Sequence, residues 1–447
     1  MHSLTAAGVA APSESEIERR TIRKVMWRLM PLMALLYVIN NLDRVNVSFA
    51  ALTMNRDLGL TPYVYGWGAG IFYVTYCLLE VPSNVFMARI GARVWIARIM
   101  ITWGLVSGAM ALVIGPWSFL TMRLLLGAAE AGFIPGMILY ITYWFPAAYR
   151  GRAVALFLLA SPISSAIASL LSVPILGMEG VAGLHGWQWM FLIEALPALI
   201  LGGLVLVFLT NRPRDARWLT ADERQWLERR IQQDQPADAS HSVSLGRTLV
   251  DPRVLALSVV YLGRTASMYG ITFFLPQIVK GIGLSNQAVG YVSALPYVVA
   301  TIGMVLVASH SDRQNERRWH VIGTMMAAAA GLVAAGMLGN SAWALAALSI
   351  AAIGFFAMSP CFWPLPSMFL RGEAKAGGIA IINAIGNLGG FIGPYGVGLA
   401  AASTGSFASG LYFLAGCATL SGVVILAIGR PHHPAVARVG QREASHA

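Results

Sequence analysis

The sequence predicts an all-α membrane protein with twelve transmembrane helices in two pseudo-symmetric halves of six. Of its 447 residues, 57% are hydrophobic and 11% are charged, whereas soluble domains average about 45–50% and about 25%. At about 20 residues per span, this apolar content suffices for roughly twelve spans. The apolar runs also group as six and six around one long polar stretch. A water-soluble protein is therefore excluded.

The apolar runs are separated at nearly every junction by Gly, Pro and Arg residues, which mark turns and loops. The first six runs cover residues 25–50, 62–88, 93–113, 116–142, 150–174 and 187–210. The second six cover residues 252–280, 286–310, 319–338, 341–369, 376–402 and 407–429. The predicted organisation is an N-terminal tail (1–24), a first half (25–210), a linker (211–251), a second half (252–429) and a C-terminal tail (430–447).

Basic residues gather in alternate connections between the runs. Cytoplasmic loops retain Lys and Arg, and one set of connections is rich in both, while the other holds little beyond Arg56 and Lys280. We therefore expect an inner-membrane protein with both termini and the linker in the cytoplasm. The net charge of +11 follows from this topology, so nucleic acid is not an expected partner.

Apolar residues recur at helical spacing in the polar linker. They are Trp218, Leu219, Trp226, Leu227 and Ile231. Charged residues lie between them, which is typical of an amphipathic helix. We expect this helix to lie on the cytoplasmic face.

Few ionisable residues lie well inside the apolar runs: Asp43, Arg44, Arg123, Glu130, Glu194 and Arg264. Each costs at least about 2.5–3.5 kcal/mol at the bilayer centre, so such residues usually pair, line a pathway or perform transport. Seven positions separate Arg123 from Glu130, which places both on one helix face with the small Gly127 between them. Asp43 and Arg44 diverge by about 100° around a helix, so we expect each to find a partner on another span.

Several motifs resemble a known family. Ser311-Asp312-Arg313, followed by Arg317-Arg318, resembles the loop signature of the major facilitator superfamily, and a degenerate first copy contains Arg89 and Arg93. The fourth span, from Arg123 through Glu130 to Gly136, resembles the anion:cation symporter family, as do residues 41–44 and 383–394. The resemblance covers nearly the whole chain. It implies the major facilitator fold.

Members of this family carry organic anions, including sugar acids, tartrate, phthalate and aromatic acids, and many bacterial members use proton symport. The resemblance implies substrate contacts at Arg44, Arg123, Tyr76, Trp363 and Asn383. Ser161 and Asn387 face the same level and are further candidate substrate contacts, although Ser161 stands where glutamine is usual. It also implies a gating or structural role for the loop residues Arg89, Arg93, Asp312, Arg313 and Arg317.

Arg264 resembles the seventh-span arginine of vesicular glutamate transporters. One interpretation is a second anion contact from the other half, which favours a substrate with two acidic groups. The alternative is an arginine that reaches toward the cytoplasmic interface, because it lies only 12 residues into its run.

The residues themselves suggest how coupling could work. Burial favours the neutral form of a carboxyl group and a nearby arginine favours the charged form, so Asp43 and Glu130 are the candidate proton sites. Arginine offers a planar fork of donors to a carboxylate. Protonation of an acid paired with Arg44 or Arg123 would free that arginine for the substrate. The alternative is a purely structural network of buried ion pairs, and Glu194 is interpreted as a scaffold or gating residue.

The sequence thus predicts a proton-coupled symporter that imports an organic anion by alternating access, with an exchanger or effluxer of the same fold as the alternative. No Walker motif, catalytic elbow or metal-ligand spacing is visible, so we expect neither an enzyme nor a metal site. Protons are the expected coupling ion and no other cofactor is expected. The expected partners are the small organic anion and the lipid bilayer, and the expected state is a monomer.

Overall fold

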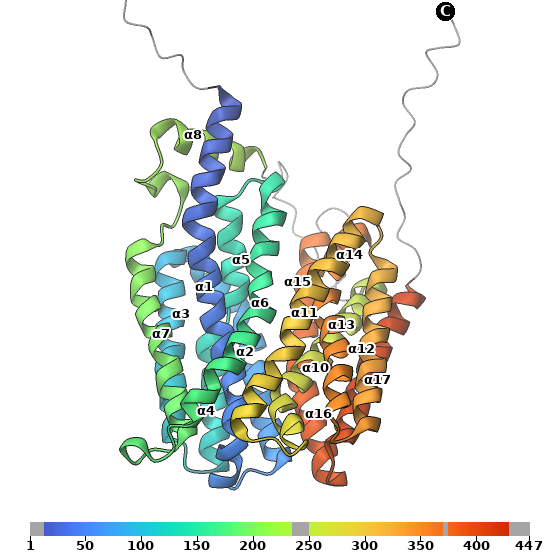
Figure 1. Cartoon of the computed structure of the whole chain (residues 1–447). Coiled ribbons are helices and arrows are strands. Elements are labelled where there is room, and N and C mark those ends of the chain that lie inside the picture. The colour runs from blue at the N-terminus through green and yellow to red at the C-terminus, as the bar shows by residue number, and fades with distance from the viewer. Residues whose placement is uncertain (1–12, 235–249, 370–373, 429–447) are drawn as a thin grey trace, which may run out of the picture.

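The computed structural model describes residues 13–234, 250–369 and 374–428 (Figure 1). Twelve of the described helical segments are long and apolar enough to cross a membrane, as predicted. The first six spans are α1 (Glu14–Asp57), α2 (Pro62–Ile90), α3 (Ala92–Ala109), the pair α4 (Pro116–Glu130) and α5 (Phe133–Trp144), α6 (Ala147–Leu176) and α7 (Gly186–Phe208). The second six are α10 (Pro252–Lys280), α11 (Asn286–Gln314), α12 (Arg318–Leu338), the pair α13 (Ala342–Phe362) and α14 (Pro364–Phe369), the pair α15 (Ala374–Asn387) and α16 (Gly389–Thr404), and α17 (Phe407–Ala427).

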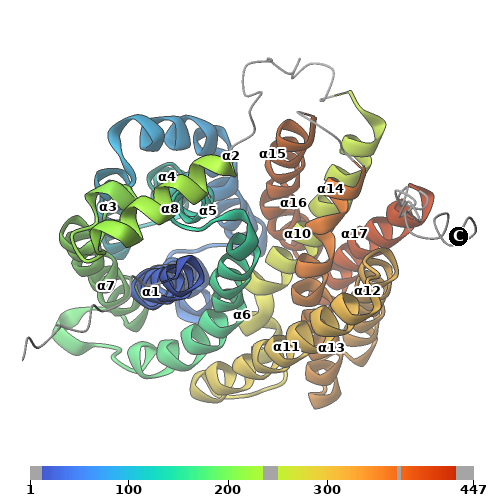
Figure 2. The same cartoon turned by 90° about the horizontal axis from the view of Figure 1, so that it is seen from above.

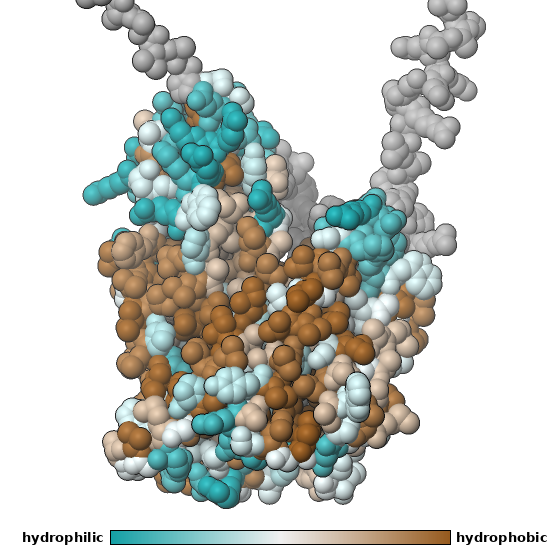
Figure 3. Space-filling view, in the orientation of Figure 1, coloured by the Kyte–Doolittle hydropathy of each residue, from teal (hydrophilic) through white to brown (hydrophobic). Residues whose placement is uncertain are grey.

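The two sets of spans form two bundles that lie side by side (Figure 2). A broad hydrophobic band covers the middle of the face that Figure 3 shows, and hydrophilic residues gather at its two ends. Large apolar side chains are exposed on spans of both halves, for example Leu78, Ile200, Leu306 and Leu420. Such a band is the surface that a bilayer would cover.

The predicted tails need one correction. The first helix begins at Glu14 and runs unbroken to Asp57, so residues 14–24 extend the first span instead of forming a separate tail. Polar and charged residues near the start of α1 do not stop the helix because Gly and Pro are absent there until Pro31. The rest of the predicted N-terminal tail, residues 1–12, and nearly all of the C-terminal tail lie outside the described residues.

The two halves share an arginine at the start of the third span of each half, which indicates an internal repeat. Arg93, at the start of α3, donates through Nε to the carbonyl of Leu206 near the end of α7. Arg318, at the start of α12, donates through Nη2 to the carbonyl of Leu426 near the end of α17, at 2.8 Å. Each arginine satisfies a carbonyl that has no partner within its own helix end. The repeat inferred from the basic loops therefore has a structural counterpart.

The predicted amphipathic linker helix is present as α8 (Ala221–Gln233), preceded by the short 3-10 helix η3 (Pro213–Asp215). Thr220 caps it by accepting from the backbone N–H of Glu223. Trp226 and Leu227 are buried. Trp218 lies before the helix, where its ring stacks on Trp144 of α5 with centroids 5.4 Å apart. The helix is thus shorter than predicted and packs on the first half; residues 235–249 of the linker lie outside the described residues.

Glu223 ties α8 to the start of α1. Its carboxylate accepts from Arg20 Nε at 2.7 Å and from Lys24 Nζ at 3.0 Å. Burial alone would raise the pKa of Glu223, but the hydrogen bonds from Lys24, from the Thr220 backbone and from Arg20 hold it below its ordinary value of 4.5. Replacing the Glu223 carboxylate leaves Arg20 and Lys24 without their common acceptor.

We expect Glu223→Gln to lower the free energy of unfolding by about 1–2 kcal/mol, a value discounted because Arg20 and Lys24 are partly exposed. Because the pKa is lowered in the folded state, this contribution is present above the ordinary pKa and disappears as pH falls through the folded-state pKa. The difference in melting temperature between wild type and variant, followed from pH 7 to well below the ordinary pKa of 4.5, should therefore shrink as the pH falls. A constant difference would contradict this assignment.

Glycines at helical spacing let the spans of the second half pack closely. A Cβ added to Gly389 would lie 2.4 Å from the Leu262 carbonyl oxygen, and one added to Gly393 would lie 2.0 Å from that of Ala266. Both contacts join α16 to α10. The α10 backbone cannot move aside at these contacts, so a larger side chain than that of glycine would not fit.

We expect Gly393→Ala to destabilise the protein by about 1–3 kcal/mol, because the added methyl group overpacks this contact. Gly416→Ala is the matched control, since nothing lies within 4 Å of its added Cβ. Thermal unfolding in detergent measures both. Equal melting temperatures for the two variants would contradict the packing argument.

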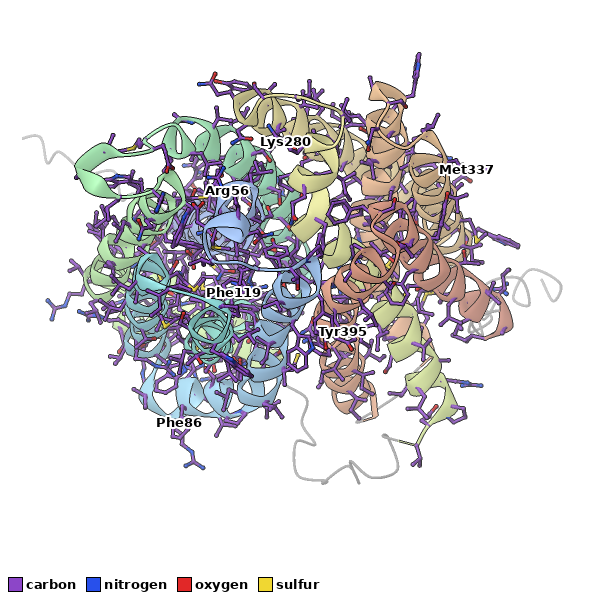
Figure 4. All side chains as sticks on the ribbon, turned by 90° about the horizontal axis from the view of Figure 1, so that it is seen from below. Arg56, Phe86, Phe119, Lys280, Met337 and Tyr395 are labelled. Atoms are coloured by element: carbon purple, nitrogen blue, oxygen red, sulfur yellow. The ribbon has the colours of Figure 1, made fainter. Side chains whose placement is uncertain are left out.

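The two halves meet closely at the end opposite α8, which we call the closed end. Added Cβ atoms would lie 2.5 Å from the Pro394 carbonyl oxygen at Gly66 and 1.9 Å from a Val173 methyl group at Gly290. These contacts join α2 to α16 and α11 to α6. Figure 4 looks onto this end and shows Arg56 and Lys280 there. These are the two basic residues that the sequence placed opposite the basic connections.

Candidate functional site

A buried ion pair joins the first and fourth spans. Arg44 of α1 donates through Nε to Oε1 of Glu130, the last residue of α4. Asn40, one turn earlier on α1, donates to the same oxygen at 2.7 Å. Arg44 is 9% exposed and Glu130 is fully buried. Neither side chain is fully satisfied, because Nη2 of Arg44 and Oε2 of Glu130 have no hydrogen-bond partner.

Aromatic rings from α2 surround the Arg44 guanidinium. Its Cζ lies 4.8 Å from the ring centroid of Tyr76, 5.4 Å from Phe72 and 6.0 Å from Tyr73. Tyr73 in turn contacts Tyr269 of α10, with ring centroids 4.5 Å apart. The free nitrogen of Arg44 therefore lies beside the boundary between the halves, where a planar fork can take an anionic group.

A break in the fourth span places Glu130. The sequence predicted one run over residues 116–142, but α4 ends at Glu130 and α5 begins at Phe133. Gly132 between them has φ 85°, and an added Cβ would lie 2.4 Å from Ser83 Oγ. Only glycine combines this conformation with so close a neighbour. Interrupted helices at binding sites are a recurrent feature of transporters.

Arg123 is more deeply enclosed than a substrate contact in an open site. It is 1% exposed, and Nε donates to the carbonyl of Gly68 at 3.1 Å. Its guanidinium lies 5.0 Å from the Phe72 ring and 5.8 Å from that of Phe273 in the other half. Gly127 lies between Arg123 and Glu130, and an added Cβ there would lie 2.1 Å from the Phe72 carbonyl oxygen. The small residue thus lets α2 approach α4 closely.

Asp43 belongs to a second buried group, on the other side of α1. It is 1% exposed and accepts from Ser107 of α3 and from Asn46 Nδ2, the latter at 3.2 Å. Glu194 of α7 is 5% exposed, and neither of its carboxylate oxygens has a partner. Asp43 and Arg44 therefore find their partners on different spans, as their divergence around the helix predicted.

The second half brings Arg264 and Trp363 together around Tyr261. Arg264 is 7% exposed, donates through Nε to the Phe355 carbonyl at 3.0 Å and lies 5.8 Å from the Tyr261 ring centroid. Trp363 packs against the same tyrosine, with centroids 4.9 Å apart. Arg264 thus bonds to α13 inside the bundle. It does not reach toward the cytoplasmic interface, as the second of its two interpretations proposed.

Sequence reasoning missed Glu80 of α2. It is 7% exposed, and its two carboxylate oxygens accept from Asn383 Nδ2 at 2.8 Å and from Asn387 Nδ2 at 3.3 Å. Both asparagines were predicted to bind substrate. The available signal was its position one helical turn after Tyr76, on the same face of α2.

The remaining predicted residues lie in the middle of α6 and in the loops. The Ser161 carbonyl accepts from Asn41, Ser164 and Ser165, at 3.4, 2.8 and 3.2 Å. In the loops, Arg317 pairs with Asp312 and donates to Ser311 Oγ at 3.0 Å. The backbone N–H of Arg93 donates to Asn211, and Arg89 and Arg313 are exposed. The contacts of Arg93 and Arg317 lie in the loops between helices.

All the buried acids of the described spans lie in the first half: Asp43, Glu80, Glu130 and Glu194. The described interior of the second-half spans contains Arg264 but no Asp or Glu. The two halves therefore offer unlike chemistry to whatever binds between them.

Comparison with known proteins assigns this fold to a family. A family model described as Major Facilitator Superfamily matches residues 33–394. The chain belongs to this superfamily. This confirms the resemblance stated on the loop and fourth-span motifs.

Relatives within the Major Facilitator Superfamily are named as transporters. An Agrobacterium vitis protein named "Putative tartrate transporter" is 51% identical over 424 residues, which cover 94% of each chain. An Acinetobacter baumannii protein named "Quinolone resistance transporter" is 41% identical over 401 residues, 89% of this chain and 92% of that one. A solved D-xylose-proton symporter shares the fold, with a TM-score of 0.71, 15% identity and coverage of 91% of this chain and 98% of that chain. The protein is a multi-pass membrane transporter of this superfamily and not an enzyme.

Proposed function

We propose that the protein is a proton-coupled symporter that imports a small organic anion, with Arg44 as the carboxylate-binding residue. The observation that carries the proposal is the incompletely satisfied Arg44–Glu130 pair beside the boundary between the halves. A buried arginine with a free donor attracts an anion, and a buried carboxylate with a free oxygen attracts a proton. One pair of residues thus supplies both binding functions.

The coupling step follows from competition for Arg44. While Glu130 is charged, it holds the Arg44 guanidinium. When Glu130 takes a proton, Asn40 can still donate to it, but its attraction for Arg44 falls and the fork becomes free for the substrate carboxylate. Asp43 is the second candidate proton site. No covalent chemistry is needed.

The orientation of the transport cycle rests on the basic connections. If these face the cytoplasm, the closed end faces the outside and the conformation described here is the inward-facing one. Alternating access then requires the contacts of Gly66 with Pro394 and of Gly290 with Val173 to separate.

The substrate class is supported by the chemistry of both halves. Arg44 and Arg264 come from opposite halves, and Tyr76 and Tyr261 lie against them with ring centroids 4.8 and 5.8 Å away. Two cations and phenol groups suit a hydroxylated dicarboxylate, and tartrate is the compound named for the Agrobacterium vitis relative.

Uptake of radiolabelled tartrate into proteoliposomes tests the proposal. We expect accumulation when the outside is acidic and its loss when a protonophore collapses the gradient. A thermal-shift screen of the purified protein against mono- and dicarboxylates, sugar acids and aromatic acids identifies the class, because a ligand stabilises the state that it binds. Stabilisation by none of these acids would refute the anion assignment.

Efflux is the second candidate, because the Acinetobacter baumannii relative carries a resistance name. Exchange is the third. Gradient-driven net uptake into vesicles that contain no substrate excludes exchange. Proton-driven extrusion of tartrate or of a quinolone from preloaded cells, without gradient-driven uptake, would instead establish efflux.

A further inference from the structure

Glu80 is the one acidic or basic side chain among the described residues that is hydrogen-bonded across the two halves. Asn383 and Asn387 lie one turn apart on α15, so their amide groups form a two-pronged donor, and each carboxylate oxygen of Glu80 receives one prong. Hydrogen bonds to a charged acceptor are about twice as strong as neutral ones. The contact is therefore a specific link between α2 and α15.

This link lies away from the closed end. Gly66 contacts α16 near the start of α2, and Glu80 lies 14 residues further along the same helix, which corresponds to about 21 Å. The contacts at Gly66 are between backbone atoms. The link at Glu80 is between side chains and can be exchanged for other partners without moving the helices first.

Glu80 also lies beside the proposed anion site. The Arg44 guanidinium lies over the ring of Tyr76, which precedes Glu80 by one turn on α2. Arg44 is also close enough to act on Glu80 electrostatically. The amide donors that were predicted to bind substrate, Asn383 from the resemblance and Asn387 from its level in the membrane, are thus occupied by a carboxylate of the protein itself. A bound anion and the Glu80 carboxylate would compete for the same donors.

We infer that Glu80 is a resident competitor of the substrate: it links the two halves through Asn383 and Asn387 when no anion is bound, and the anion displaces it. This inference rests on the proposed function. Glu80 then sets specificity, because only a ligand whose oxygens replace those of Glu80 at both amide groups releases the link. It also ties any further separation of the halves at the α8 end to occupancy.

A mutant cycle with tartrate as the probe tests the competition. We expect Glu80→Ala to bind tartrate about tenfold more tightly than wild type, and Glu80→Gln to lie between them because a neutral amide remains a weaker acceptor. In an Asn383→Ala/Asn387→Ala background, adding Glu80→Ala should give no further gain, because the competition is already absent. A tenfold gain that persists in that background would overturn the inference, since Glu80 would then act only by repelling anions.

A distance measurement without ligand tests the link independently of the substrate. Spin labels at Arg152→Cys and Gln314→Cys, exposed positions at the α8 ends of α6 and α11, report separation of the halves in a chain whose three native cysteines are replaced. We expect Glu80→Ala and Glu80→Gln to widen the distribution. Asn55→Ala is the control, because it removes a neutral bond to Gln277 near the closed end.

The two readouts separate the two claims. Absence of tartrate binding in wild type, with widening in Glu80→Ala, would count against tartrate as the substrate and leave the link supported. An unchanged distance in both Glu80 variants, each folded by its melting temperature, would overturn the link whatever the protein binds.

Discussion

Arg44→Lys should abolish measurable stabilisation by tartrate while leaving a folded protein. Lysine keeps the positive charge that Glu130 requires but presents a point charge in place of the planar fork, so a bidentate carboxylate contact is lost. We expect a loss of affinity of at least about 30-fold, equivalent to roughly 2 kcal/mol. Thermal shift and uptake measured on the same preparations give the result.

The alanine variant separates binding from folding. Arg44→Ala leaves Glu130 buried without its cation, which typically costs about 3–5 kcal/mol, so its loss of activity alone would prove little. Arg44→Ala/Glu130→Gln removes the uncompensated charge and should recover much of the melting temperature without recovering tartrate binding. Recovery of binding in this double variant would show that Arg44 serves only as the partner of Glu130.

Glu130→Gln should uncouple transport from the proton gradient. The amide mimics the protonated acid, so Arg44 is released at every pH and the substrate site stays available. We expect gradient-driven accumulation to fall to background, at least about tenfold, while tartrate binding and counterflow exchange persist. Uptake, counterflow and binding are measured in parallel.

Glu194→Gln is the comparison for this variant, because Glu194 is also buried and acidic but lies in the Asp43 group away from Arg44. It should leave tartrate affinity within about twofold of wild type, since it makes no contact with the fork. Failure of Glu130→Gln to fold, or coupled uptake by it at the wild-type level, would refute the coupling role.

Much of the candidate site could be predicted because charge inside a membrane is costly. Asp43, Arg44 and Glu130 lie in the middle of apolar runs, where an ionisable residue has few structural explanations. The divergence of Asp43 and Arg44 around one helix also predicted partners on different spans. Periodicity and the cost of burial carried these expectations without any knowledge of contacts.

Glu80 and the helix break at Gly132 could not be predicted in the same way. Glu80 lies near the end of its apolar run, where a carboxylate usually reaches water, and its partners are 303 and 307 residues away in the chain. A glycine inside an apolar run is compatible with an unbroken helix, so the pattern does not reveal the left-handed conformation of Gly132 or its closeness to Ser83. Both features arise from tertiary contacts between distant segments.

The unequal distribution of acids between the halves bears on how such a carrier can diversify. Since Asp43, Glu80, Glu130 and Glu194 all belong to the first half, a chimaera that keeps this half and takes its second half from a relative inherits every one of these buried acids. Only the opposing surface, with its arginine and aromatic residues, would be exchanged. Under the proposed function, cargo preference can then drift in the second half while the candidate proton sites stay fixed in the first.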